Sequence, residues 1–275
     1  MSFRQMLRGD WLVDKNSTAY TLGFAAAVTI VCAILLGVAA TKLKPLQQTN
    51  AEVDKKSKIL LALNEFNPKA NKTDEAYRSS EDVLAYFDKD GFKDKFVVKF
   101  AVNHDGKVIE GLSDNELSNL ELEPQIKKFP NEADFGKRKY PIYAFYASKA
   151  DFEAKKATSY VIPIYGYGLW SNCYGVLALN QTGDTVQNIV YYKHGETPGL
   201  GGEIEKEYFT KPFIGKKVFN AKGEVALKTT KGEVNENTVP AVSGATFTMD
   251  GIDNMLKKFI TIYDKFFQSK RGGAQ

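Results

Sequence analysis

Cysteine and histidine are both scarce in this chain, which restricts the chemistry that its side chains can support. The 275 residues include two Cys and two His. Cys32 lies inside an apolar run and Cys173 far along the chain, so their number excludes a disulfide framework and a cysteine-based metal site. His104 and His194 have no metal-ligating residue at suitable spacing except Glu196, two positions after His194. We therefore predict no metal site.

The chain also lacks a large excess of either charge. The 37 Lys and Arg residues against 33 Asp and Glu give a formal net charge of +4. This balance does not predict a nucleic-acid-binding surface, so we expect no nucleic-acid partner. A hydrophobic content of 43% is enough to bury a full core, in one large or two modest domains.

One long segment carries no charge, no amide side chain and no proline, from Ala19 to Ala40. At about 1.5 Å per residue such a helix reaches roughly 33 Å, enough to cross a bilayer. We predict a transmembrane helix over 19–40, after an N-terminal tail over 1–18. A cleaved signal peptide is the alternative, since Gly37-Val38-Ala39 offers small residues at cleavage-like spacing, but its apolar core is normally about 7–15 residues.

Residues 41–58 follow this span as a polar juxtamembrane connector that contains Pro45, and a soluble domain is expected over 59–275. The lysines of the connector outnumber the basic residues before the span, so charge alone does not settle which side the domain occupies.

The soluble part alternates irregularly between helical and β-rich segments. Helical spacing runs from Thr73 to Phe87, and His104-Asp105-Gly106 and Thr182-Gly183-Asp184 read as turns. Strands are expected at Phe96–Val102, Tyr140–Tyr146, Ser159–Tyr165, Val176–Leu179 and Val186–Tyr192. The prolines in the second and third of these strands suggest edges or strand starts. The absence of a regular β-α alternation predicts an α+β fold.

The strongest helix prediction begins just after Ser243-Gly244-Ala245-Thr246. Apolar residues then recur on one helical face: Ile252, Met255, Leu256, Phe259, Ile260, Tyr263, Phe266 and Phe267. The free N–H groups and positive dipole end at such a terminus favour a phosphate, and Thr246 places a hydroxyl there. The alternative is that small and hydroxyl residues only cap the helix.

Two glycine-rich stretches lie upstream, where the backbone can approach a ligand or another element closely. The first runs from Tyr165 to Gly175 and includes Gly168, Leu169 and Trp170. The second runs from His194 to Glu203 and includes Glu196, Thr197 and Leu200. The first lacks the third glycine and helix of a dinucleotide fingerprint, and the second lacks the Lys-Ser/Thr of a P-loop. The aromatic rings of the first could equally pack into the core at a β-bulge. Together with the Ser-Gly-Ala-Thr turn, the two loops could supply N–H donors and an apolar wall for a flat ring.

The Ser-Gly-Ala-Thr sequence resembles the flavinylation motif of FMN-binding subunits in membrane redox complexes, although Pro240 stands where that pattern usually has an acidic residue. With Gly-Leu-Trp-Ser, His-Gly-Glu-Thr-Pro-Gly-Leu-Gly and one N-terminal span in the same order, nearly the whole chain resembles the C subunits of Na⁺-translocating NADH:quinone oxidoreductases. The G subunit of the related Rnf complex shares the flavin motif but typically lacks Gly-Leu-Trp.

The resemblance implies covalent FMN, joined through its phosphate to Thr246 by a flavin transferase. It implies further flavin contacts from Ser243, Gly244, Ala245, Gly168, Leu169, Trp170, Glu196, Thr197 and Leu200, and no catalytic acid, base or nucleophile. Such a protein, in a complex with the A, B, D, E and F subunits, relays single electrons from an intramembrane iron–sulfur centre to a flavin in the B subunit. Its domain lies on the outer side of the bacterial cytoplasmic membrane.

A hypothesis of a different class remains open from the residues alone. The chain could be a membrane-anchored extracytoplasmic binding or structural protein without flavin, in which Ser-Gly-Ala-Thr only caps a helix.

Overall fold

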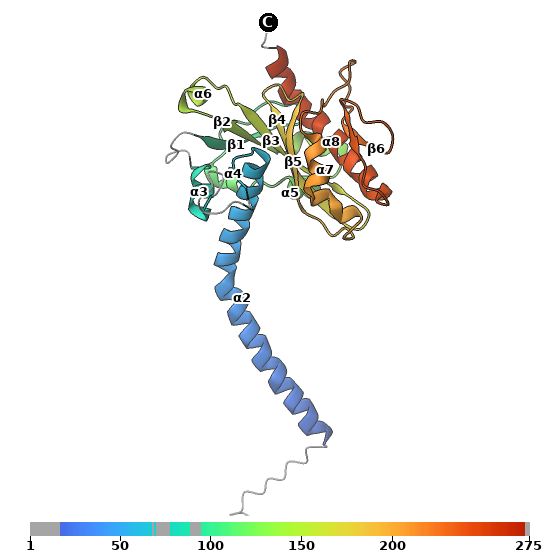
Figure 1. Cartoon of the computed structure of the whole chain (residues 1–275). Helices are drawn as coiled ribbons and strands as arrows, with labels where there is room; N and C mark the ends of the chain where they lie inside the picture. The colour runs from blue at the N-terminus through green and yellow to red at the C-terminus, as the bar shows by residue number, and fades with distance from the viewer. Residues whose placement is uncertain (1–16, 68, 70–77, 89–94, 273–275) are drawn as a thin grey trace, which may run out of the picture. The chain divides into compact units, whose positions relative to one another are not determined.

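A computed structural model describes residues 17–67, 69, 78–88 and 95–272. The helices are α2 (Thr18–Ala62), α3 (Ser80–Ala85), α4 (Asp114–Ser118), α5 (Leu122–Lys128), α6 (Lys149–Glu153), α7 (Glu207–Thr210) and α8 (Thr246–Gly272), with 3-10 turns η1 (Glu132–Lys137), η2 (Gly201–Glu205) and η3 (Lys211–Phe213) (Figure 1). The strands are β1 (Phe96–Val102), β2 (Tyr140–Tyr146), β3 (Ser159–Tyr167), β4 (Asn172–Asn180), β5 (Val186–Lys193), β6 (Lys228–Thr230) and β7 (Thr238–Pro240).

Helix α2 contains the apolar segment and continues far beyond it. Its apolar part has a mean hydropathy of 2.5 and no buried residue, so it is long and apolar enough to cross a membrane. The helix then runs through Pro45, whose missing N–H costs it one hydrogen bond, to Ala62. The connector predicted over 41–58 is therefore helical. Its Gln, Glu, Lys and Leu residues are good helix formers, which explains why one proline does not end it.

The chain divides into two compact units, residues 1–52 and 53–275. The second unit therefore begins at Val53, six positions before the domain start that we placed at Ile59. The last turns of α2 belong to it, because Ile59, Leu60 and Ala62 are buried there.

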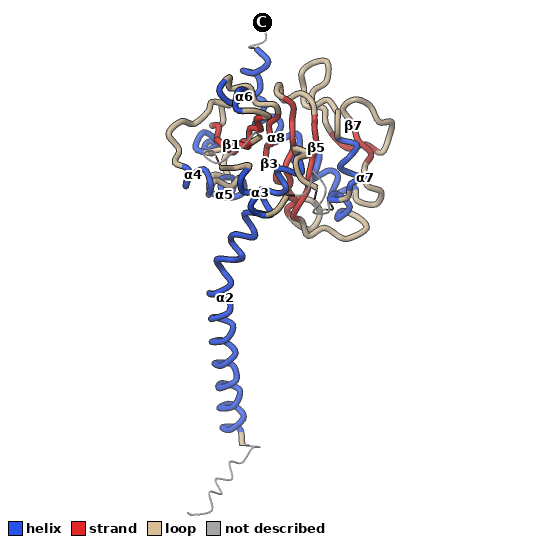
Figure 2. Tube along the Cα trace, turned by 60° about the vertical axis from the view of Figure 1, so that its left-hand side comes forward, coloured by secondary structure: helices blue, strands red, loops and turns tan. Residues whose placement is uncertain are grey.

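A five-stranded antiparallel sheet in the order β1-β2-β3-β4-β5 forms the centre of this unit (Figure 2). Alternate residues point to opposite faces, as strand geometry requires. Tyr140, Ile142 and Ala144 of β2 pack with α8, whereas Tyr143 and Phe145 pack with the end of α2 and with α3. The sheet thus has helices on both faces, and the architecture is α+β as predicted.

All five predicted strands are present, and β1, β2 and the two predicted turns match closely. His104 lies in the first turn, where Gly106 has a φ of 76°. The helix predicted over 73–87 is shorter, α3 beginning at Ser80; residues 73–77 lie outside the described part of the chain.

The prolines predicted to mark edge strands lie in β2 and β3, which are both internal in the sheet order. The ladder between β2 and β3, however, joins only 143–145 to 159–161. Pro141 and Pro163 lie outside it, so neither has to donate an N–H to that ladder. Pro141 is the second residue of β2, so the alternative expectation of a strand start holds there. Pro163 lies within β3 and marks neither an edge nor a strand start.

Helix α8 packs along β3 and supplies the largest group of core side chains. All eight apolar positions predicted for its inner face are buried, none more than 4% exposed. The first turn of this helix is thereby fixed against the ends of β3 and β4, where the candidate site lies.

Candidate functional site

Ser243 and Gly244 form a tight turn immediately before α8. The N–H of Ala245 donates to the carbonyl of Val242 at 3.3 Å, and Gly244 has a φ of 77°. A positive φ at the third position of such a turn is typical of type II and favours glycine. The residue directly before the helix is Ala245, whose methyl group cannot cap it. At this position the motif therefore supplies no side-chain cap for the first N–H groups of α8.

Thr246 is the first residue of α8 and is exposed, so its hydroxyl is accessible. The ammonium group of Lys231 donates to this hydroxyl at 2.8 Å. Lys231 follows β6, which is joined to α8 because Thr229 donates through its N–H (2.7 Å) and hydroxyl (3.1 Å) to the carboxylate of Asp253. Lys231 was not predicted from the sequence, since no motif around it indicates that it contacts Thr246.

Glu196 joins three separate segments of the site, and its side chain is buried. Its carboxylate accepts hydrogen bonds from the backbone N–H groups of Leu169 (3.1 Å), Trp170 (3.0 Å) and Ser171 (3.0 Å). The hydroxyl of Thr248, in the first turn of α8, donates to the same carboxylate at 2.8 Å. One side chain therefore connects the loop between β3 and β4, the loop after β5 and the start of α8.

These contacts determine the charge state of Glu196. Burial favours the protonated form, but hydrogen bonds from Thr248 and from the three N–H groups favour the carboxylate more strongly and hold its pKa below the ordinary value of 4.5. The carboxylate is engaged by protein donors, so the structure places Glu196 as a residue that positions the site rather than one directed toward a ligand.

The glycines of the two loops allow these segments to approach each other closely. A Cβ on Gly168 would lie 2.7 Å from the Glu196 carboxylate, and one on Gly201 would lie 2.4 Å from the Thr248 hydroxyl. On the helix side, a Cβ on Gly251 would lie 2.2 Å from the carbonyl oxygen of Tyr167. The prediction of close backbone approach is confirmed for these loops, and what they approach is α8 and Glu196.

The large apolar side chains of the loops face outward. Trp170 is 65% exposed and Leu200 42% exposed, so the alternative that the first loop buries its rings at a bulge is wrong for Trp170. Leu200 lies against the turn, 3.0 Å from the position of a Cβ on Gly244. Leu169 is also exposed, and Thr197 shapes its loop by accepting the N–H groups of Leu200 and Gly202.

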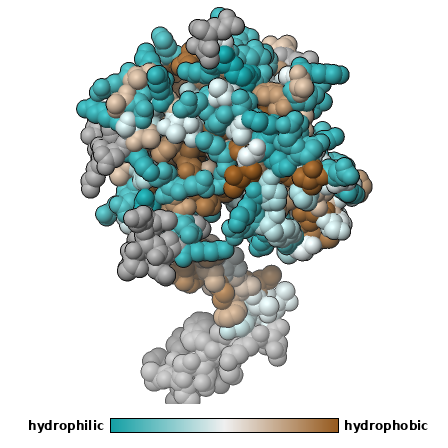
Figure 3. Space-filling view, turned by 45° about the horizontal axis from the view of Figure 1, so that its top comes forward, coloured by the Kyte–Doolittle hydropathy of each residue, from teal (hydrophilic) through white to brown (hydrophobic). Residues whose placement is uncertain are grey.

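Two further exposed rings near Thr246 were not predicted. Phe247 follows it directly and is 69% exposed, and Tyr167 donates its hydroxyl to the carbonyl of Trp170 at 3.3 Å. On the face of the molecule in Figure 3, most side chains are hydrophilic and hydrophobic ones gather in small patches. We call Tyr167, Leu169, Trp170, Leu200 and Phe247 the apolar rim of the site.

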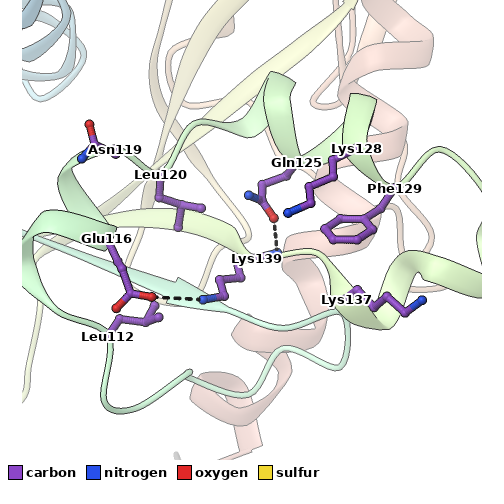
Figure 4. Close-up of a pocket in the computed structure, with 9 residues that line it drawn as sticks. All are labelled: Leu112, Glu116, Asn119, Leu120, Gln125, Lys128, Phe129, Lys137 and Lys139. Carbon is purple, nitrogen blue, oxygen red and sulfur yellow. Dashed lines mark hydrogen bonds and ion pairs between the residues drawn. The ribbon is translucent and has the colours of Figure 1, made fainter.

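A cavity of about 270 Å³ is formed elsewhere, by α4, α5 and the segment that leads into β2 (Figure 4). Its lining includes Lys128, Lys137 and Lys139, and Lys139 points toward Glu116. None of the predicted site residues contributes to it. The functional interpretation therefore depends on the chemistry around Thr246 and not on the size of a cavity.

Comparison with known proteins finds a matching family model and sequence relatives. A model of the FMN-binding domain family matches residues 168–261, which include both loops and the start of α8. The chain is 33% identical over 248 residues to the C subunit of the Na⁺-translocating NADH-quinone reductase of Haemophilus ducreyi, with 89% of this chain and 90% of that protein covered.

Two solved structures have the same fold. NqrC of Shewanella oneidensis is 25% identical, with a TM-score of 0.61, and the match covers 81% of this chain and 99% of that one. The C subunit of the Na⁺-translocating NADH-quinone reductase of Parabacteroides distasonis is 24% identical, with a TM-score of 0.58 over 82% of this chain and 96% of that one. With sequence relatives of this kind across almost its full length, the chain belongs to the family of C subunits of Na⁺-translocating NADH-quinone reductases.

Proposed function

We propose that this chain is the FMN-carrying C subunit of a Na⁺-translocating NADH-quinone reductase, with FMN attached through its phosphate to the hydroxyl of Thr246. The observation that carries the proposal is an exposed hydroxyl next to an ammonium group, at the start of a helix whose first turn Glu196 joins to the two glycine loops. An FMN held there supplies one-electron transfer, which no side chain of the site provides.

The residues of the site suit the two ends of this cofactor. The free N–H groups of the first turn of α8 and the Lys231 ammonium favour a phosphate. The apolar rim, with Trp170 and Leu200, suits a flat ring. Because Gly244 has no side chain, the turn leaves room for the side chain of Leu200 beside it. Ser243 and Ala245 shape the turn itself.

The proposed role in the complex is electron relay. The chain would take single electrons from an intramembrane iron–sulfur centre and pass them to a flavin in the B subunit, within an assembly that also contains the A, D, E and F subunits. Helix α2 would anchor it in the bacterial inner membrane with the large domain outside, since long domains translocate largely regardless of flanking charge. A flavin transferase would attach the FMN.

Co-expression of the full chain with a flavin transferase tests the proposal. After denaturation in acid and electrophoresis, we expect flavin fluorescence on the band of the chain, and mass spectrometry should place the FMN mass on the peptide that contains Thr246. The Thr246→Ala variant should fold and carry no covalent flavin.

Ser243→Ala and Thr248→Ala are the matched controls, because these are the nearest other hydroxyls, and both should still be modified. Thr248 is 2% exposed and donates to Glu196, so it is not accessible to the transferase. A modified peptide in Thr246→Ala would refute the attachment site. A wild-type band without flavin would refute the function and favour a membrane-anchored binding or structural protein.

A further inference from the structure

Lys231 lies at the attachment hydroxyl without a carboxylate partner. Its ammonium donates to the Thr246 hydroxyl at 2.8 Å, and within the described part of the chain it makes no ion pair with Asp or Glu. A neutral hydroxyl leaves the positive charge uncompensated. Several exposed lysines pair with acidic groups instead, as Lys95 does with Glu65, whereas Lys217 also donates to a threonine hydroxyl, that of Thr185.

The fold, and not only the flexible side chain, brings Lys231 to this point. Strand β6 pairs in parallel with β7, Thr230 lying opposite Pro240. Thr229, two residues before Lys231, is buried and donates two hydrogen bonds to the carboxylate of Asp253 in α8. The backbone on the N-terminal side of Lys231 is thus fixed to the same helix that begins with Thr246.

We propose that Lys231 is the cation that pairs with the phosphate of the FMN joined to Thr246, an inference that rests on the proposed function. A phosphate diester carries one negative charge next to the esterified oxygen, within reach of an ammonium that already contacts that oxygen. A lysine ammonium acts as a compact point charge that suits a tetrahedral phosphate, and the N–H groups of α8 bind the same anion from the helix side. Lys231 is a positioning residue: it holds the phosphate end while the ring lies on the apolar rim.

The test compares the ¹³C resonances of labelled lysine side chains in the wild-type full chain with and without covalent flavin. The chain is labelled by reductive ¹³C-methylation, and Lys231→Met and Lys257→Met identify the two resonances. Lys257 lies on α8 further from Thr246 and is exposed, so it serves as the control. We expect the Lys231 resonance to shift between the unloaded and the loaded chain, because a phosphate charge then lies next to its ammonium group, and the Lys257 resonance to stay in place.

The ³¹P resonance of the loaded chain gives a second measurement. It should move in Lys231→Met, stay in place in Lys257→Met, and return toward the wild-type position in Lys231→Arg. If the Lys231 resonance is identical with and without flavin, the inference is wrong while the proposed function stands. If the wild-type chain takes no flavin, both are wrong, so the two failures are distinguishable.

Discussion

Replacing Glu196 is the sharpest test of how the site is held together. Its carboxylate accepts the N–H groups of 169–171 and the hydroxyl of Thr248, and it is 5% exposed. Glu196→Ala removes the acceptor from all of these donors at once. Glu196→Gln keeps the shape but directs an amide N–H₂ group toward one of them.

The size of the effect follows from the number of donors left unpaired. A hydrogen bond to a charged group contributes about 1.5–3 kcal/mol, and such contributions do not add fully within one network. Water can reach the outer side of the exposed loop, so we expect Glu196→Ala to lower the free energy of unfolding by about 3–5 kcal/mol. For Glu196→Gln we expect about 1–2 kcal/mol, because the Thr248 hydroxyl can turn and accept while the N–H of Leu169 loses its acceptor.

The depressed pKa of Glu196 predicts how this difference depends on pH. A carboxyl whose pKa is lower in the folded state stabilises the fold above the unfolded pKa, near 4.5, and this contribution is lost as the pH falls through the folded pKa. Wild type should therefore exceed Glu196→Gln in stability at neutral pH, and the two should converge below pH 4.5.

Urea denaturation of the full chain in detergent measures the stability, and hydrogen exchange at the amides of 169–171 measures the local contacts. Those amides should exchange faster in both variants. Glu205→Gln is the control, since Glu205 lies nearby but is exposed. Unchanged exchange at 169–171 in Glu196→Ala would refute the positioning role.

Three other changes test the remaining parts of the interpretation. Trp170→Ala should alter the absorbance and potential of the bound flavin and leave its covalent bond intact, with a change of less than about 1 kcal/mol in unfolding free energy because the ring is exposed; an unchanged spectrum would remove Trp170 from the ring site. Gly251→Ala should destabilise by about 1–3 kcal/mol in thermal unfolding, because its Cβ meets the backbone of Tyr167, whereas Gly272→Ala in open space at the end of α8 should not. Alkaline phosphatase fused after Gln275 should be active, because this enzyme works only after export and the proposed topology places the domain outside. An inactive phosphatase, together with a fluorescent cytoplasmic reporter at the same junction, would place the domain inside.

The fold was largely predictable because its strands form short β-rich apolar runs and α8 buries one face. Phe96–Val102 is such a run, and the buried positions of α8 recur with helical spacing. What local patterns could not supply was the continuation of α2 through Pro45, since a proline in a polar stretch usually indicates a break and here the surrounding residues favour a helix.

The candidate site, like the fold, was predictable only in part. The segments that approach one another were predictable from their glycines, but the side chains that connect them were not. Lys231 contacts Thr246, and Asp253 contacts Thr229, because β6 pairs with β7 and packs against α8. These contacts join residues that are far apart in the sequence. The resemblance identified Glu196 as a site residue, but only the folded structure shows that its carboxylate is directed into the protein.

The arrangement of the site gives a physical reason for a covalent bond to the cofactor. A cofactor held without a covalent bond usually needs a pocket that buries most of its surface. Around Thr246 the polar contacts of Glu196 are buried, whereas the apolar rim is exposed and forms an open surface. The proposed bond to Thr246 would fix one end of the FMN at a high effective concentration next to that surface, so its retention would not depend on enclosure. The exposed ring edge would then face an electron partner, and the buried hydrogen bonds of Glu196 would hold the loops beneath the ring in place.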